Sequence, residues 1–336
     1  MLMARATRAD VAKLAGVSLA TVSHVMNGRA EELGFNPQTA KRVEEAAAQL
    51  GYIPKAAARA FRYQRTKVIA FFMGEVPESL HLPVFNELLL GAVEAATKAD
   101  YFVLPVVLPP EQSDLIPQII RRTLQEVELA GALCEVGDHP FEAFDLLKKS
   151  QLPVAWIFPH SLAPQVPECA TFGIDEAAGV RELLGQINTS VVKNPVYLRG
   201  PGPLTARREP FFELFPHART VEAESWLSGA GYRALGSCVA NDSHPDLVFA
   251  ANDPLGLGAL NAVRDLEIVF PHDIQLFSYG NFDQVQSPLV QLSAIHWPLT
   301  ELSTLAVESL VDPAGLTPGV RNLPSTARVR STTLRP

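Results

Sequence analysis

The stretch from Thr7 to Asn27, TRADVAKLAGVSLATVSHVMN, constrains this chain most, because it predicts two short helices joined by a tight turn. Thr7, with Asp10 three residues later, predicts a capping box at the start of the first helix. Gly16 stands where the turn requires a positive φ. Ser18 is a typical N-cap residue for the second helix. The stretch is therefore typical of a helix-turn-helix.

Helical spacing predicts which side chains of this hairpin are buried. Val11, Leu14 and Ala15 share one face of the first helix, and Val22 and Val25 of the second helix face back onto it. The side chains that remain on the outer face of the second helix are Leu19, Ala20, Ser23, His24 and Asn27. A short exposed helix with small and polar groups fits a DNA major groove. The alternative is an ordinary helical hairpin in a small bundle.

A third helix and a basic linker follow the hairpin. The sequence Asn36-Pro37 predicts an N-cap followed by proline at the first helical position, and Gly51 predicts the end of this helix. Residues 54–65 are rich in alanine and arginine, and a helix this short is marginal in water unless DNA or a partner holds it. We therefore interpret residues 1–53 as a helical domain and residues 54–66 as a hinge helix or linker.

Two segments carry a resemblance to a known family. VAKLAGVSLATVSHVMNG and AAAQLGYIPKAAARAFRYQRT, in this order and spacing, resemble the LacI/GalR (lactose/galactose-repressor) family of bacterial transcription regulators. The resemblance implies that residues 1–53 bind double-stranded operator DNA. Ser18, Thr21 and Asn27 would contact phosphates, which fix position without reading sequence. Leu19, Ala20 and His24 would read base edges. Thr7 and Ser23 are further expected DNA contacts.

The linker is expected to contact DNA as well. In the family this segment pairs with its dimer mate in the minor groove, and the wedge position corresponds here to Phe61. Lys55, where the family usually has asparagine, and Arg59 are the expected phosphate contacts. The alternative for Phe61 is packing on the rest of the chain.

The charge distribution supports a basic DNA-binding end. Residues 1–65 hold ten Lys/Arg and five Asp/Glu, a net charge of +5, whereas the remainder holds 18 basic and 31 acidic residues, a net charge of −13. The overall pI near 5.5 would argue against nucleic acid, but this separation does not. The chain is expected to hold phosphates at one end only.

From residue 67 onward, the pattern is that of alternating buried strands and helices. KVIAFFMG, YFVLPVVL, GALCEVG and PVAWIF are apolar runs separated by helical patterns, and the series restarts at TFGID. Continuously apolar strands that alternate with helices predict parallel sheets covered on both faces. The predicted fold class is an all-α helix-turn-helix head plus an α/β domain of two doubly wound parallel-sheet lobes.

This larger region resembles the type I periplasmic-binding-protein fold of the family's regulatory domain. The resemblance implies an effector-binding and dimerisation domain over residues 67–336, in which the chain crosses between lobes near residues 164, 294 and 322. Lobe 1 would comprise residues 67–163 and 295–321, and lobe 2 residues 164–294 and 322–336. A ligand would lie between the lobes, outside the carboxyl ends of the strands.

The resemblance implies effector contacts at several loop ends. Arg207 matches the family arginine that clamps a hydroxyl or carboxylate, with Arg208 as the alternative register. The other expected contacts are Phe85, Trp226, Asn252, Asn281 and Trp297. Gly280 replaces the aspartate that the family commonly uses here, and the loss of this carboxylate removes a charge-assisted hydrogen bond. Three alternatives follow: Asn281 or Asp283 substitutes for the aspartate, the effector is less polar than a standard sugar, or the cleft no longer senses a small molecule.

The residues that enzymes and metal sites need are not arranged for those roles. The histidines are scattered without metal-ligand spacing, the three cysteines are far apart in apolar surroundings, and no GxSxG elbow is present. We therefore expect no catalytic residue, no metal and no cofactor.

The sequence as a whole predicts a homodimeric, sequence-specific DNA-binding repressor with a small-molecule effector, such as a sugar or nucleobase. Tetramer formation stays open, and a twofold dimer should select a near-palindromic operator. The apolar runs are too short to span a membrane, and MLMARATRAD lacks a secretory core, so we expect a cytoplasmic protein. The alternative is a solute-binding protein without DNA function.

Overall fold

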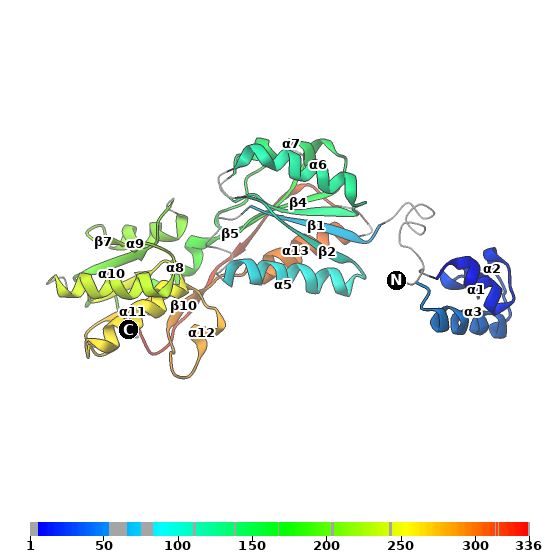
Figure 1. Cartoon of the computed structure of the whole chain (residues 1–336). Helices are drawn as coiled ribbons and strands as arrows, with labels where there is room; N and C mark the ends of the chain where they lie inside the picture. Colours follow the sequence, from blue (N-terminus) through cyan, green and yellow to red (C-terminus); the bar gives the residue numbers. More distant parts are fainter. Residues whose placement is uncertain are drawn as a thin grey trace. The chain divides into compact units, whose positions relative to one another are not determined.

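The computed structural model describes residues 6–53, 66–74, 83–109, 112–137, 139–166, 168–202, 205–241, 244–312, 314 and 316–334. The chain divides into two compact units, residues 1–67 and residues 68–336. We call them the head and the body and describe each by itself (Figure 1).

The head is a three-helix unit whose helix ends follow the predicted capping. Its helices are α1 (Arg8–Ala15), α2 (Leu19–Met26) and α3 (Pro37–Leu50). The capping box of Thr7 and Asp10 is present, Gly16 ends α1 at φ 66°, and Ser18 accepts a hydrogen bond from the Thr21 N–H at 3.1 Å. Asn36 caps α3, with proline in its first turn, as predicted.

The core of the head is small and largely as predicted. Val11, Ala15, Val22 and Val25 are buried, together with Val43, Ala46 and Ala47 of α3. The prediction for Leu14 was wrong, because this side chain is 48% exposed while Ala12 is buried. The reason is that α1 packs against both α2 and α3, which turns the buried face of α1 away from Leu14 and toward Ala12.

Lobe 1 of the body is a parallel six-stranded sheet in the order β11-β5-β4-β3-β1-β2. Its strands are β1 (Val68–Met73), β2 (Phe102–Val107), β3 (Gly131–Glu135), β4 (Val154–Phe158), β5 (Ala170–Asp175) and β11 (Gly319–Pro324). Helices α5 (Pro83–Lys98) and α13 (Leu299–Val311) cover one face, and α6 (Ile116–Glu126) and α7 (Asp145–Lys149) cover the other (Figure 1).

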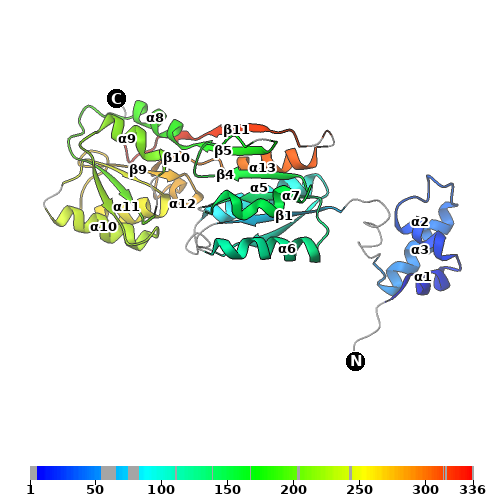
Figure 2. The ribbon, with the colours of Figure 1, turned by 90° about the horizontal axis from the view of Figure 1, so that it is seen from above.

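Lobe 2 repeats this design with the order β12-β10-β9-β8-β6-β7. Its strands are β6 (Pro195–Arg199), β7 (Arg219–Glu222), β8 (Leu247–Ala250), β9 (Gln275–Gly280), β10 (Ser293–His296) and β12 (Thr326–Arg328), of which β12 is antiparallel to β10. Helices α8 (Glu176–Gln186) and α9 (Glu209–Leu214) lie on one face, and α10 (Ser228–Ala240) and α11 (Asp253–Asp265) on the other (Figure 2). The short helix α12 (Asp283–Gln286) follows β9.

One of the three predicted lobe crossings is displaced. The sequence predicts the first crossing near residue 164, but β5 pairs with β4 and β11 in the sheet of lobe 1, so the chain crosses after Asp175. The sequence pattern could not show that β5 belongs to lobe 1, because a buried strand reads the same in either sheet. The third crossing follows β11 and lies at Ser325, close to the predicted position near residue 322. The crossing predicted near residue 294 follows β10, which ends at His296.

The three crossings bring the lobes into continuous contact. One cluster of buried apolar residues includes Phe71 and Phe172 of lobe 1 and Phe211 and Phe277 of lobe 2. The Trp297 indole N–H, just after the second crossing, donates to the Pro159 carbonyl of lobe 1 at 2.9 Å. The Ser325 hydroxyl donates to the Asp175 carbonyl at 2.8 Å and so ties the third crossing to the first. The hinge is thus a packed, hydrogen-bonded region.

Candidate DNA-contacting helix and inter-lobe site

The second helix of the head presents a row of exposed side chains. Ser18, Leu19 and Ala20 are exposed, and Leu19 has 48% of its surface accessible. Val22 and Val25, on the opposite side of α2, are buried against the other helices. A helix held by its apolar side, with its first turn exposed, has the form needed to enter a groove.

The later residues of this helix are less exposed than the sequence predicts. The His24 imidazole stacks on the Phe35 ring at 6.0 Å, and the Asn27 amide donates to the Ser23 carbonyl at 2.5 Å. Ser23, His24, Thr21 and Asn27 are all half-buried. Part of each polar group expected to face DNA is therefore used in the packing of the head itself.

The remaining predicted DNA contacts divide into two groups. The Thr7 hydroxyl donates to the Asp10 carboxylate at 2.6 Å, and this bond holds the pKa of Asp10 below its ordinary value. Thr7 is therefore primarily a cap. Lys55, Arg59 and Phe61 lie outside the described residues.

In the body, Arg207 is buried and ion-paired. Its Nη2 donates to Glu176 Oε1, and its Nη1 donates to the Ala251 carbonyl at 2.7 Å. The exposed fractions of the two side chains are 5% for Arg207 and 0% for Glu176. Burial acts to lower the pKa of Arg207, but the Glu176 carboxylate, with smaller contributions from Tyr279 and Tyr197, acts to raise it, and the net shift is upward. Arg207 is therefore held in its charged form.

Aromatic rings cover this ion pair. The Arg207 guanidinium lies 4.2 Å from the centroid of the Tyr279 ring and 4.7 Å from that of Trp297. These are cation–π distances. Burial, followed by the negative charge of Glu176, raises the pKa of Tyr279, so its phenol stays neutral. The structure thus brings together two of the expected effector contacts, Arg207 and Trp297, and Glu176 and Tyr279 lie beside them.

Trp226 and Asn252 form a second predicted pair. The Asn252 side chain caps α11 by accepting from the Leu255 N–H at 2.8 Å, and it donates to the Trp226 carbonyl at 3.0 Å. The Trp226 ring lies over Gly200, where an added Cβ would meet the ring at 2.5 Å. Asn252 thus uses both ends of its amide within the protein, and its evident role here is to hold the loops.

The glycine that replaces the expected aspartate has a structural cause. Gly280 has φ +144°, a region that favours glycine, and a Cβ there would lie 2.8 Å from an Asp253 carboxylate oxygen. Asp253 accepts from the Phe282 N–H at 2.7 Å and from the Ser278 hydroxyl. Burial raises the pKa of Asp253 to about 6. The buried carboxylate of this region therefore comes from α11 and not from residue 280.

Two other predicted contacts lie apart from the Arg207 pair. The Asn281 side chain accepts a hydrogen bond from Arg330, and Phe85 of α5 is half-buried against the core shared by the lobes. Arg208, the alternative register, places its guanidinium 5.5 Å from the Phe212 ring centroid. The structure thus favours Arg207 over Arg208 as the inward-facing arginine.

Sequence reasoning missed several polar residues at strand ends. Glu135, at the end of β3, is buried and accepts from the Gly74 and Gly137 N–H groups, both at 2.7 Å. The His139 imidazole lies 2.9 Å from the Ser113 hydroxyl. One sequence pattern could have identified these residues and Glu176: in each case an acidic or imidazole side chain stands at the end of an apolar strand or just after it.

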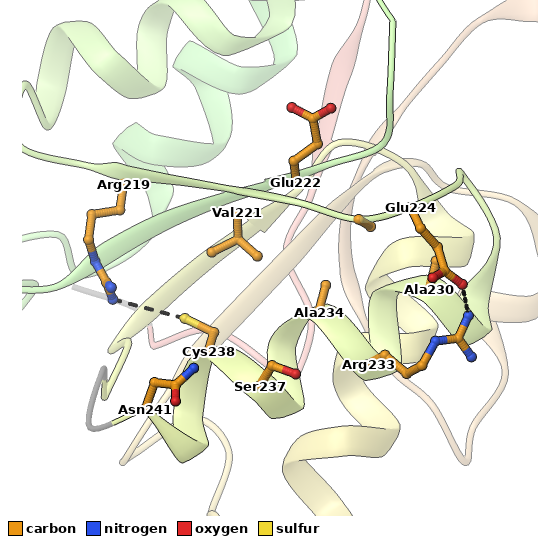
Figure 3. Close-up of a pocket in the computed structure, with 11 residues that line it drawn as sticks. Arg219, Val221, Glu222, Glu224, Ala230, Arg233, Ala234, Ser237, Cys238 and Asn241 are labelled. Carbon is orange, nitrogen blue, oxygen red and sulfur yellow. Dashed lines mark hydrogen bonds and ion pairs between the residues drawn. The ribbon is translucent and has the colours of Figure 1, made fainter.

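A shallow pocket of about 500 Å³ lies on lobe 2, between edge strand β7 and helix α10 (Figure 3). Charged groups at its rim include Arg219, Glu222, Glu224 and Arg233, and the Glu224 carboxylate pairs with Arg233. None of the predicted effector contacts lines this pocket. It is thus separate from the predicted effector residues.

Within the described residues, no cluster of three or more His, Cys, Asp or Glu side chains could hold a metal ion. The cysteines carry free thiols, with Cys134 and Cys238 buried as predicted and Cys169 only half-buried. Over the same part of the chain, no helix combines the length and apolar character that a membrane span needs.

Comparisons with known proteins match both units. Residues 7–55 match the family described as bacterial regulatory proteins, lacI family, and residues 204–333 match the periplasmic binding protein-like domain. The ribose operon repressor of Haemophilus influenzae is 29% identical over 317 residues, which cover 91% of both chains. The repressor PurR of Pectobacterium carotovorum is 29% identical over 319 residues, which cover 91% of this chain and 90% of the relative.

Solved structures share the same fold. The lac repressor dimer bound to operator and the anti-inducer ONPF aligns with a TM-score of 0.79 at 19% identity, over 98% of this chain and 100% of that one. The complex of the regulator CelR with cellobiose aligns with a TM-score of 0.64 at 21% identity, over the same shares. At these identities the structures establish the common fold.

Proposed function

We infer that this chain, which joins a helix-turn-helix domain of the lacI family of bacterial regulatory proteins to a periplasmic-binding-protein-like domain, is a sequence-specific transcriptional repressor. The observation that carries the inference is the exposed first turn of α2, held by a buried apolar face, in the basic part of an otherwise acidic chain. The named relatives are themselves transcriptional repressors.

DNA contacts are assigned to the head and linker. Ser18, Thr21 and Asn27 position α2 on phosphates, and Leu19 and Ala20 contact base edges through apolar atoms. Ser23, His24 and Thr7 contribute with the part of each side chain that the head leaves exposed. Lys55, Arg59 and Phe61 of residues 54–66 supply the linker contacts.

We assign homodimer formation to the free edge of lobe 1. Strand β2 is an edge strand of the lobe 1 sheet, and its residues Phe102 and Val107 are 71% and 48% exposed. Leu90 and Val93 on the adjacent helix α5 are exposed as well. Exposed apolar side chains beside an open strand edge favour association with a second copy.

Effector binding is assigned to the region where the lobes meet. Arg207, Trp297, Trp226 and Asn252 lie in loops at the ends of lobe 2 strands, where ligands bind in open α/β sheets. Phe85 and Asn281 complete the proposed contacts. A ligand that changes how the lobes close would alter the dimer and residues 54–66, and through them the affinity for operator DNA.

The alternative function, a solute-binding protein without DNA contacts, leaves the lacI-family head of residues 7–55 unexplained. An enzyme is disfavoured because the named relatives are repressors. Because its operator would lie on the chromosome, we propose that the protein acts in the cytoplasm.

In vitro selection of random duplex DNA with the full-length chain tests this function. We expect a near-palindromic site whose affinity falls at least about 100-fold between 50 and 200 mM salt, since phosphate contacts release counterions. The control is a duplex of the same composition with one half-site scrambled. A selection that enriches no sequence, or binding that salt does not weaken, would favour the solute-binding alternative.

A further inference from the structure

The ion pair of Arg207 and Glu176 lies where two crossings between the lobes meet. Glu176 is the first residue of α8, directly after β5 of lobe 1, and Arg207 lies between β6 and α9 of lobe 2. Trp297, which covers the guanidinium, is hydrogen-bonded to lobe 1 through Pro159. The pair is therefore part of the hinge as well as of the proposed effector region.

The opposite charges of Arg207 and Glu176 cancel, so the pair has no net charge that could attract a charged ligand. Glu176 neutralises Arg207 inside a region from which water is excluded, where an unbalanced charge is costly. A carboxylate or phosphate that approached Arg207 would have to displace Glu176 or lie beside it as a like charge. Both arrangements are unfavourable, so Glu176 acts against anionic ligands.

Two polar atoms of the pair remain unused. Glu176 Oε2 and Arg207 Nε are buried, and neither has a hydrogen-bond partner among the described residues. Buried polar atoms almost always have a partner, and ordered water or a ligand accounts for many exceptions. One of these atoms is an acceptor and the other is a donor. A hydroxyl or a carboxamide can serve both at once.

We propose that Glu176 is a specificity-determining residue that restricts the effector to uncharged molecules carrying hydroxyl or carboxamide groups, and excludes carboxylates and phosphates. The proposal rests on the function proposed above for the inter-lobe region. It assigns a role to a residue that the sequence pattern did not indicate. It also explains how the arginine of this region can act without binding an anion.

Thermal unfolding of the full-length chain with sodium acetate as the probe tests the proposal, at constant ionic strength made up with sodium chloride. Glu176→Gln preserves the size of the side chain and exposes the charge of Arg207. Acetate should raise the Tm of this variant by about 3 °C or more in a saturable manner, and should leave the wild-type Tm unchanged. The matched control Glu176→Gln/Arg207→Gln lacks the guanidinium and should not respond to acetate.

Two results would overturn the proposal. One is a folded Glu176→Gln variant whose Tm does not respond to acetate. The other is a wild-type Tm that rises with acetate, a measurement that needs no variant and stands if Glu176→Gln fails to fold. Operator binding is measured separately by gel shift. If the chain bound no operator but responded to acetate as expected, the proposed repressor function would be refuted and the proposed role of Glu176 would stand.

Discussion

The head and the body present their candidate residues in opposite ways. In the head, the expected contacts lie on one short helix, and Leu19 at its start is 48% exposed. In the body, the candidate residues come from segments that are far apart in the sequence, and Arg207, Glu176, Tyr279 and Trp297 are all buried. A surface that must meet a large rigid partner can be built locally, whereas a site that must enclose a small molecule has to be assembled from distant segments.

The largest expected effect comes from placing a charge in the core of the head. Val22→Asp buries a carboxylate among apolar side chains at a cost of about 5 kcal/mol, which a three-helix unit of this size cannot absorb. Specific operator binding should be lost in a gel shift. Tryptophan fluorescence should be unchanged, because all three tryptophans lie in the body.

Leu14→Asp is the matched control, since it adds the same charge at an exposed position of α1. Its operator affinity should fall less than about tenfold, which reflects charge alone. Equal losses for the two variants would show that burial in the head does not decide DNA binding.

The second prediction concerns the buried ion pair of the body. Arg207→Ala leaves Glu176 as an uncompensated buried charge, so the free energy of unfolding should fall by about 3–5 kcal/mol. Arg208→Ala, one residue away and half-buried, should cost less than about 1 kcal/mol. Urea denaturation followed by tryptophan fluorescence measures both. A larger loss of stability for Arg208→Ala than for Arg207→Ala would favour Arg208 as the inward-facing arginine.

The free energy of unfolding of the body should also depend on pH. The folded-state pKa of Asp253, about 6, lies above its ordinary value of 3.8, so protonation favours the folded state. Its stabilising contribution should be complete below pH 4 and disappear as the pH rises through 6, a change of about 3 kcal/mol.

Asp253→Asn removes this titration, so the wild-type free energy of unfolding, relative to that of the variant, should fall between pH 4 and pH 7. Urea titrations of both proteins at several pH values measure the difference. A difference that is constant with pH would contradict the raised pKa.

The smallest expected effect comes from one exposed side chain of the head. Leu19→Ala should weaken binding to the selected operator by about 1–2 kcal/mol and leave binding to unrelated duplex unchanged, because apolar contacts to bases carry sequence information. Leu33→Ala, at a similarly exposed position after α2, is the control. If Leu19→Ala weakened binding to every duplex equally, its role would be that of a positioning residue.

Local sequence signals predicted the head well. The caps at Thr7, Ser18 and Asn36 and the left-handed Gly16 were confirmed, because each depends on residues within a few positions along the chain. The exposure of Leu14 was not predictable, since it depends on which side of α1 meets α3. The partial burial of His24 depends in the same way on Phe35, a residue outside its helix.

In the body, the sequence pattern predicted the alternation of strands and helices, and the family resemblance indicated Arg207. Neither predicted the partner of Arg207. Glu176 and Arg207 are separated by 31 positions, and only the packing of α8 against the loop after β6 brings them together. The conformation of Gly280 was likewise decided by the close approach of Asp253 from another element.

The sequence by itself determined what depends on neighbours along the chain: helix ends, the periodicity of buried strands, and the concentration of basic residues in one part. Tertiary structure decided which sheet receives β5, which carboxylate neutralises Arg207, and which polar atoms remain without partners. The physical reason is that capping and periodicity are short-range, whereas burial and ion pairing depend on which distant groups share a region from which water is excluded.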